Sequence, residues 1–69
     1  MEIQKLLEKN GPGRFALAGE DGNAFSIMAR VRRGLRMAGW PPGDVDIVLR
    51  EMRRSSYDHL LLTAMEVQE

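Results

Sequence analysis

Apolar side chains recur every three or four positions along most of this chain, a spacing that predicts amphipathic helices. The longest such stretch covers residues 23–38, and two shorter ones cover residues 44–54 and 57–66. At about 100° per residue, the apolar residues of each stretch fall on one arc, so each helix has one face for a core. These residues are Ala24, Ile27, Met28, Val31, Leu35 and Ala38, then Val45, Val48, Leu49 and Met52, and finally Tyr57, Leu60, Leu61, Ala64 and Met65.

Residues with capping and turn preferences separate the three helices. Asn23 and Ser56 each stand directly before a helical pattern, where a side-chain oxygen can accept a backbone N–H of the first turn, so both are predicted N-caps. Gly39 suits the left-handed position beyond the C-terminus of the first of these helices. The segment Trp40-Pro41-Pro42-Gly43 is then a rigid connection, after which Asp44 is expected to open the next helix.

The N-terminal part of the chain predicts a short helix followed by a short strand. Apolar residues at helical spacing precede the turn formers Asn10 to Gly13, so residues 1–13 are predicted to be a helix and a turn. Residues 14–18 place their large apolar side chains on one side of an extended segment, which predicts a strand. Because a lone strand leaves backbone groups unpaired, it needs a partner. Either the tail, residues 66–69, or a second copy of the chain is expected to supply one.

Gly34 lies inside the predicted helix of residues 23–38, beside its apolar arc. Glycine at such a position costs about 1 kcal/mol relative to alanine. A close approach of another backbone, such as the strand at residues 14–18, would explain its presence.

Together these elements predict a mainly α (α+β) fold in a single small domain, residues 1–69. It is a small three-helix bundle preceded by a short N-terminal helix and a short β-strand. A chain of 69 residues without cysteine is near the lower limit for folding alone, so marginal stability is expected. We expect a monomer because the tail can pair the strand, and a homodimer that seals the strand edge or covers Ile47 and Leu62 is the alternative. The predicted core is Phe15, Leu17, Phe25, Met28, Val31, Leu35, Val48, Leu49, Met52, Leu60, Leu61 and Met65.

The net charge of zero conceals a gradient along the chain. Residues 30–54 hold seven arginines against three carboxylates, a net charge of +4, whereas residues 1–22 sum to −1 and residues 55–69 to −3. An arginine side chain can donate bidentate hydrogen bonds to phosphate or carboxylate oxygens. The basic middle of the chain is therefore a candidate surface for an acidic protein or for nucleic acid. A solvated helix face without a partner is the third interpretation. The candidate partner-binding residues are Arg30, Arg32, Arg33, Arg36, Arg50, Arg53 and Arg54, with Trp40 either as an interface anchor or as a side chain that closes the core.

Other residue patterns predict no chemistry. With no cysteine and one histidine, Tyr57-Asp58-His59 offers neither a zinc site nor a catalytic triad. The turn Asp21-Gly22-Asn23 has too few oxygen ligands for a calcium loop and lacks the lysine of a phosphate-binding loop. We therefore expect no catalytic residues, no metal site and no cofactor. No apolar run is long enough to cross a bilayer, so no membrane contact and a cytoplasmic location are expected.

Two motifs carry a resemblance to a known group of proteins. Asp-Gly-Asn-Ala-Phe (Asp21 to Phe25) and Tyr-Asp-His-Leu-Leu (Tyr57 to Leu61) resemble motifs of small uncharacterised proteins of phages, prophages and bacterial mobile elements. The similarity covers about residues 15–67, but the Trp-Pro-Pro-Gly connection and the density of arginines depart from the group. The resemblance implies no activity. It implies a context in which small proteins bind host or phage machinery, among them counter-defence inhibitors such as anti-CRISPR proteins and regulators of transcription or replication.

The expected function is therefore non-catalytic binding through the arginine-rich helical face. The expected partner is a host or phage protein complex in the cytoplasm of a bacterial host. Direct nucleic-acid binding, as in a transcription or replication regulator, is the alternative, and it predicts an affinity that falls steeply with salt.

Overall fold

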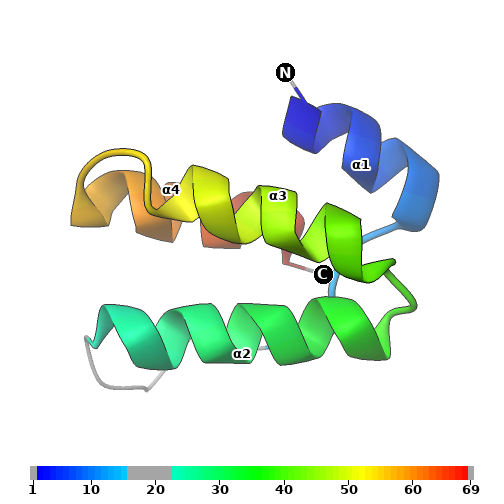
Figure 1. Ribbon diagram of the computed structural model, residues 1–69, viewed down its shortest axis with the longest axis horizontal. Helices are drawn as coiled ribbons and strands as arrows, with labels where there is room; N and C mark the ends of the chain where they lie inside the picture. The colour runs from blue at the N-terminus through cyan, green and yellow to red at the C-terminus, as the bar shows by residue number, and fades with distance from the viewer. Residues whose placement is uncertain (1, 16–22, 69) are drawn as a thin grey trace.

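The computed structural model describes residues 2–15 and 23–68. In this part of the chain four helices follow one another: α1 (Glu2–Asn10), α2 (Ala24–Met37), α3 (Pro42–Met52) and α4 (Tyr57–Val67). The last three pack against one another, and α1 lies at one end of this bundle, beside the start of α3 (Figure 1). The prediction of a mainly helical protein is confirmed.

The N-caps of α2 and α4 are the residues that the sequence predicts. The Asn23 side chain accepts the N–H of Phe25 at 2.8 Å, and the Ser56 hydroxyl accepts the N–H of His59 at 3.3 Å. At the other end of α2, Gly39 has φ +94°, and its N–H donates to Arg36 O while Trp40 N–H donates to Leu35 O, both at 3.0 Å. This pair of hydrogen bonds satisfies the last carbonyl groups of α2 and turns the chain toward α3.

Helix α3 begins earlier than the sequence pattern indicates. Pro42 is its first residue and Pro41 its N-cap, because a proline at the first helical position has no N–H that would need a partner. Asp44 therefore lies in the first turn instead of opening the helix. Its Oδ2 accepts hydrogen bonds from Lys9 Nζ and Asn10 Nδ2, both at 3.0 Å, which tie the end of α1 to α3. These two bonds, the one from Asn10 first, lower the pKa of Asp44 below its ordinary value.

The predicted strand at residues 14–18 is wrong at the positions that the structure describes. Arg14 and Phe15 belong to no strand, and residues 16–18 lie outside the described residues. The tail instead meets the segment at Gly13, whose N–H donates to Val67 O at 2.7 Å in an isolated parallel bridge with Gln68. One bridge of this kind satisfies a backbone donor without building a sheet.

The close approach predicted at Gly34 is confirmed. Arg14 N–H donates to Gly34 O at 3.1 Å, so an extended segment crosses α2 at this glycine. A Cβ on Gly34 would lie 2.8 Å from Arg14 O and 2.5 Å from Phe15 Cδ1. Both distances are shorter than van der Waals contact, which explains why a helix interior carries glycine here.

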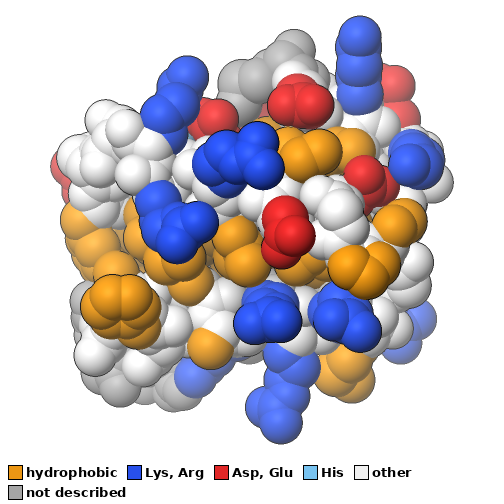
Figure 2. Space-filling model, in the orientation of Figure 1, with side chains coloured by type: hydrophobic (Ala, Val, Ile, Leu, Met, Phe, Trp, Pro, Cys, Tyr) orange, Lys and Arg blue, Asp and Glu red, His pale blue; other side chains and the backbone are white. Residues whose placement is uncertain are grey.

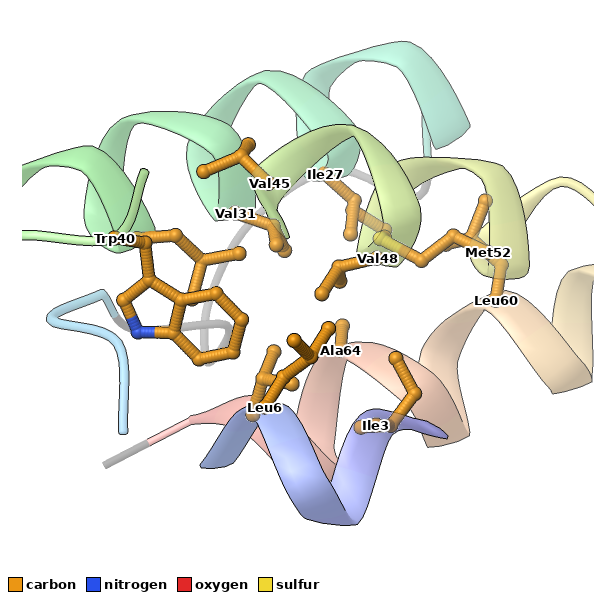
Figure 3. Packing of buried hydrophobic residues seen from close by; sticks show 12 residues of the cluster. Ile3, Leu6, Ile27, Val31, Trp40, Val45, Val48, Met52, Leu60 and Ala64 are labelled. Atoms are coloured by element: carbon orange, nitrogen blue, oxygen red, sulfur yellow. The ribbon is translucent and has the colours of Figure 1, made fainter. Parts of the chain in front are cut away.

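One cluster of buried side chains joins all four helices and the α2–α3 connection (Figure 3). Trp40 closes one end of it with only 2% of its surface exposed, and its indole N–H donates to Gly11 O at 2.9 Å. Helix α1 covers the open side of the bundle with Ile3 and Leu6 (Figure 3). The buried hydrophobic residues are Ile3, Leu6, Ile27, Val31, Leu35, Trp40, Val45, Val48, Met52, Leu60, Ala64 and Val67.

The predicted core is wrong at Phe25 and Met65, which are 81% and 60% exposed. Because Ile27 faces the core, Phe25 lies about 200° away from it on the helix and points outward. Met65 lies about 100° from the buried Ala64, at the edge of the core-facing arc. Of the other predicted members, Val31, Leu35, Val48, Met52 and Leu60 are buried, Phe15, Met28, Leu49 and Leu61 pack against the cluster partly buried, and Leu17 lies outside the described residues.

Candidate partner-binding surface

The predicted arginines form two groups, four on α2 and three at and just beyond the end of α3. Six of the seven are exposed, and Arg30 is half-buried. Trp40, the remaining candidate contact, is buried and lies in the core, so we remove it from the predicted surface. Its alternative interpretation, a side chain that closes the core, agrees with the structure. The exposed arginines are Arg32, Arg33, Arg36, Arg50, Arg53 and Arg54.

A hollow of about 510 Å³ separates the exposed sides of α2 and α3. We call it the α2–α3 groove. It is lined by Met28, Ala29 and Arg32 from α2 and by Asp46, Leu49, Arg50 and Arg53 from α3 and its C-cap. Figure 2 looks onto this face, where hydrophobic side chains form a band between the two helices and Lys and Arg side chains flank it.

The α2–α3 groove connects the two groups of arginines. Arg32 also lines a shallow hollow on the outer side of α2, together with Arg30, Arg33 and Arg36. On the other side, Arg50 and Arg53 are shared with a hollow of about 340 Å³ that contains Arg54. The guanidinium groups therefore form one continuous surface from the outer side of α2 to the far side of α3. We call these seven residues with the groove the arginine surface.

An apolar hollow of about 280 Å³ extends the groove at the end where α2 and α4 begin. It shares Met28 and Arg53 with the groove, and Phe25 and Tyr57 stand at its rim with 81% and 41% of their surfaces exposed. Sequence reasoning assigned Phe25 to the core and Tyr57 to the packed face of its helix, so it missed both as site residues. The signal that could have found Phe25 is its helical angle to Ile27.

Among the described residues, ion pairs hold few of the exposed arginines of this surface. Within residues 2–15 and 23–68, Arg54 pairs with Glu51 at 3.2 Å, and no ion pair holds Arg32, Arg33, Arg36, Arg50 or Arg53. In the groove itself, three guanidinium groups face the single carboxylate of Asp46, which leaves a net charge of +2. The surface can therefore hold carboxylate or phosphate groups.

The histidine of this chain lies outside the α2–α3 groove. His59 Nε2 lies 2.8 Å from Glu51 Oε2, and the His59 carbonyl accepts the Thr63 hydroxyl at 2.9 Å, so this histidine joins α4 to α3. In the part of the chain that the structure describes, no group of three or more His, Cys, Asp or Glu residues is arranged to hold a metal ion. The described helices also include none with the length and apolar character needed to span a membrane.

No family model, curated protein or solved structure matches this chain.

Proposed function

We propose that this chain is a small non-catalytic protein that binds a macromolecular partner, most directly a protein, through the arginine surface. One observation carries the proposal. Arg32 of α2 and Arg50 and Arg53 of α3 converge on a single groove, and in the described part of the chain no ion pair engages them. A partner that supplies carboxylates would accept charge-assisted hydrogen bonds from these guanidinium groups.

The spacing of the arginines supports a binding role over a merely solvated face. Arg32 and Arg36 lie four residues apart on α2, one turn from each other on the same side of the helix. Like charges at this spacing destabilise a helix by about 0.2–0.5 kcal/mol per pair, whereas a solvated helix usually alternates opposite charges. The chain has as many acidic as basic residues, yet α2 contains four arginines and no acidic residue.

The phage and mobile-element context is part of the same proposal. Both motifs of the resemblance lie where a helix begins, and their aromatic residues, Phe25 and Tyr57, line the same apolar hollow. This convergence supports a shared role for the two motifs at the surface. The proposed partner is a host or phage protein complex in the bacterial cytoplasm, and a counter-defence inhibitor, of which anti-CRISPR proteins are one kind, is the class of function that fits. The chain acts as a monomer in this proposal.

Nucleic-acid binding is the second candidate, and exposed aromatic side chains beside arginines favour it. Phe25 and Tyr57 could stack on bases while the guanidinium groups hold phosphates. Phosphate contacts release counterions, so this candidate predicts a steep fall in affinity with salt. A gel-shift assay with short duplex and single-stranded DNA at low salt tests it, and no shift at micromolar protein would exclude it.

Capture of partners from a bacterial lysate tests the proposed function. The variant carries Arg33→Glu and Arg36→Glu, which reverse two charges of the arginine surface on the outer side of α2. The control carries Lys5→Glu and Arg14→Glu, which change the net charge equally at exposed positions outside the arginine surface. We expect the wild-type protein and the control to retain the same protein partner. The arginine variant should lose at least about 90% of it, since a charge reversal at a contact costs several kcal/mol.

Circular dichroism should show the same helical content in all three proteins. If the arginine variant keeps the partner at near wild-type affinity, the partner-binding face has been wrongly chosen. If the wild-type protein and the control have no captured partner in common, the proposed function is wrong.

A further inference from the structure

We infer that the α2–α3 groove, together with the apolar hollow at its end, binds one amphipathic helix of the partner with an apolar stripe between rows of Asp and Glu. This inference rests on the proposed function and names the kind of segment that the arginine surface recognises. It is carried by the shape of the groove, by its floor and by its charge.

The length of the groove matches two turns of a helix. Its lining residues extend from Phe25 to Arg32 on α2 and from Asp46 to Arg53 along α3. Seven residues of an α-helix rise about 10 Å, so each wall of the groove is about that long. A partner helix that lies along it presents apolar side chains at positions i, i+3 or i+4, and i+7 over the same distance.

Three apolar side chains line the groove between its charged residues. Met28 and Leu49 are partly buried against the core and form its base, and Ala29 leaves room above them. Methionine is unbranched and fits side chains of different shapes. At the end of the groove, Phe25 and Tyr57 border a hollow of about 280 Å³ that can receive one large apolar side chain. An exposed phenylalanine beside such a hollow is typical of an anchor at an interface.

The charges around the groove select an acidic helix over nucleic acid. Arg32 stands on one wall and Arg50 and Arg53 on the other, so carboxylates on both sides of an apolar stripe would each meet a guanidinium group. Asp46 lies among these arginines and would repel the continuous phosphates of a nucleic-acid strand, whereas a helix can place a neutral or basic residue opposite it.

A designed peptide pair tests this inference. The acidic peptide is about 15 residues long, helical and fluorescently labelled, with leucines at positions i, i+3 and i+7 and glutamates on both flanks. The matched peptide carries lysines in place of the glutamates. Fluorescence anisotropy should show that the acidic peptide binds at least about tenfold more tightly than the basic one, because only it can pair with the three arginines.

Two variants place the contact in the groove. Ala29→Glu introduces a bulky negative charge at an exposed position on the groove wall, and Phe25→Ala removes the proposed anchor. Each should weaken binding of the acidic peptide by at least about tenfold. The matched controls are Leu62→Glu and Leu62→Ala, which make the same kinds of change at an exposed apolar residue of α4 that lines neither hollow. These controls should bind the acidic peptide as the wild type does.

The outcomes separate this inference from the proposed function. No binding of the acidic peptide up to about 1 mM, equal binding of both peptides, or an equal loss in the Leu62 controls would overturn the groove assignment. Displacement of the peptide by single-stranded DNA at lower concentration would also overturn it, in favour of nucleic acid. In another outcome, the variant with Arg33→Glu and Arg36→Glu loses the lysate partner while Ala29→Glu and Phe25→Ala retain it. That result would support the arginine surface and contradict the groove assignment. Peptide binding without any captured partner would support the groove assignment and contradict the proposed function.

Discussion

Replacement of Gly34 by alanine should destabilise the protein, although the same change in most helix interiors stabilises it. An added Cβ would lie 2.8 Å from the backbone oxygen of Arg14 and 2.8 Å from Phe15 Cβ, so a backbone segment must move. That movement also weakens the hydrogen bond from Arg14 N–H to Gly34 O, which is 3.1 Å long. The substitution thus sets a gain in helix propensity against a loss in packing.

The magnitude follows from these opposing contributions. Alanine gains about 1 kcal/mol of helix propensity over glycine. Overpacking costs about 1–3 kcal/mol, and loss of the hydrogen bond about 1 kcal/mol more. The net expectation is a loss of about 1–3 kcal/mol in the free energy of unfolding, which corresponds to a Tm at least about 4 °C lower in a domain of this size.

Gly43 provides the matched control because it lies in the first turn of α3 and a Cβ there would meet nothing within 4 Å. Gly43→Ala should stabilise the protein by about 0.4–1 kcal/mol, chiefly by restricting the unfolded chain. Urea denaturation, followed by the fluorescence of Trp40 and by circular dichroism, measures both variants. A Gly34→Ala protein as stable as the wild type, beside a stabilised Gly43→Ala protein, would refute the close approach of the segment to α2.

Three further substitutions test contacts that join the helices. Trp40→Phe removes the donor to Gly11 O and part of the core, and urea denaturation should show a loss of about 1–3 kcal/mol. Hydrogen bonds from α1 lower the pKa of Asp44 in the folded protein, so its carboxylate adds stability above the ordinary pKa of about 3.9 and loses it as the pH falls through the lowered value. The wild type should therefore exceed Asp44→Asn in stability at neutral pH, and denaturation at stepped pH should show this difference shrinking in acid. His59→Ala removes the contact with Glu51 and should lower stability slightly while partner capture is unchanged, whereas complete loss of function in a folded variant would point to a chemical role.

Local signals in the sequence predicted the starts of α2 and α4, the end of α2 and the role of Gly34. Asn23, Ser56 and Gly39 each act through their own backbone neighbourhood, so their roles follow from residue type and position. The role of Gly34 was predictable because glycine weakens a helix interior, and a close backbone neighbour is a contact that only glycine permits there. Pro41-Pro42 misled the prediction of the α3 start because a proline both breaks a preceding helix and begins the next one.

The tertiary details depended on information that periodicity does not contain. Phe25 is an exception, because its angle of about 200° from Ile27 already places it outside the apolar arc and agrees with its exposure. The arginines were found from charge alone, but their convergence needed the packing of α2 against α3. Trp40 was open to two interpretations because an aromatic residue on a rigid connection suits both a core and an interface. The hydrogen bond from its indole N–H to Gly11 O supports the core position.

The central claim is that the partner contacts the arginine surface along the α2–α3 groove. The most direct test is an NMR titration of the isotope-labelled protein with the partner captured from the lysate. The account predicts that amide and methyl shifts concentrate on the residues that line the groove and its apolar end, among them Phe25, Met28, Leu49 and Arg53. Shifts that concentrate instead on the exposed side of α4 around Leu62 and Met65, with the groove unchanged, would contradict it.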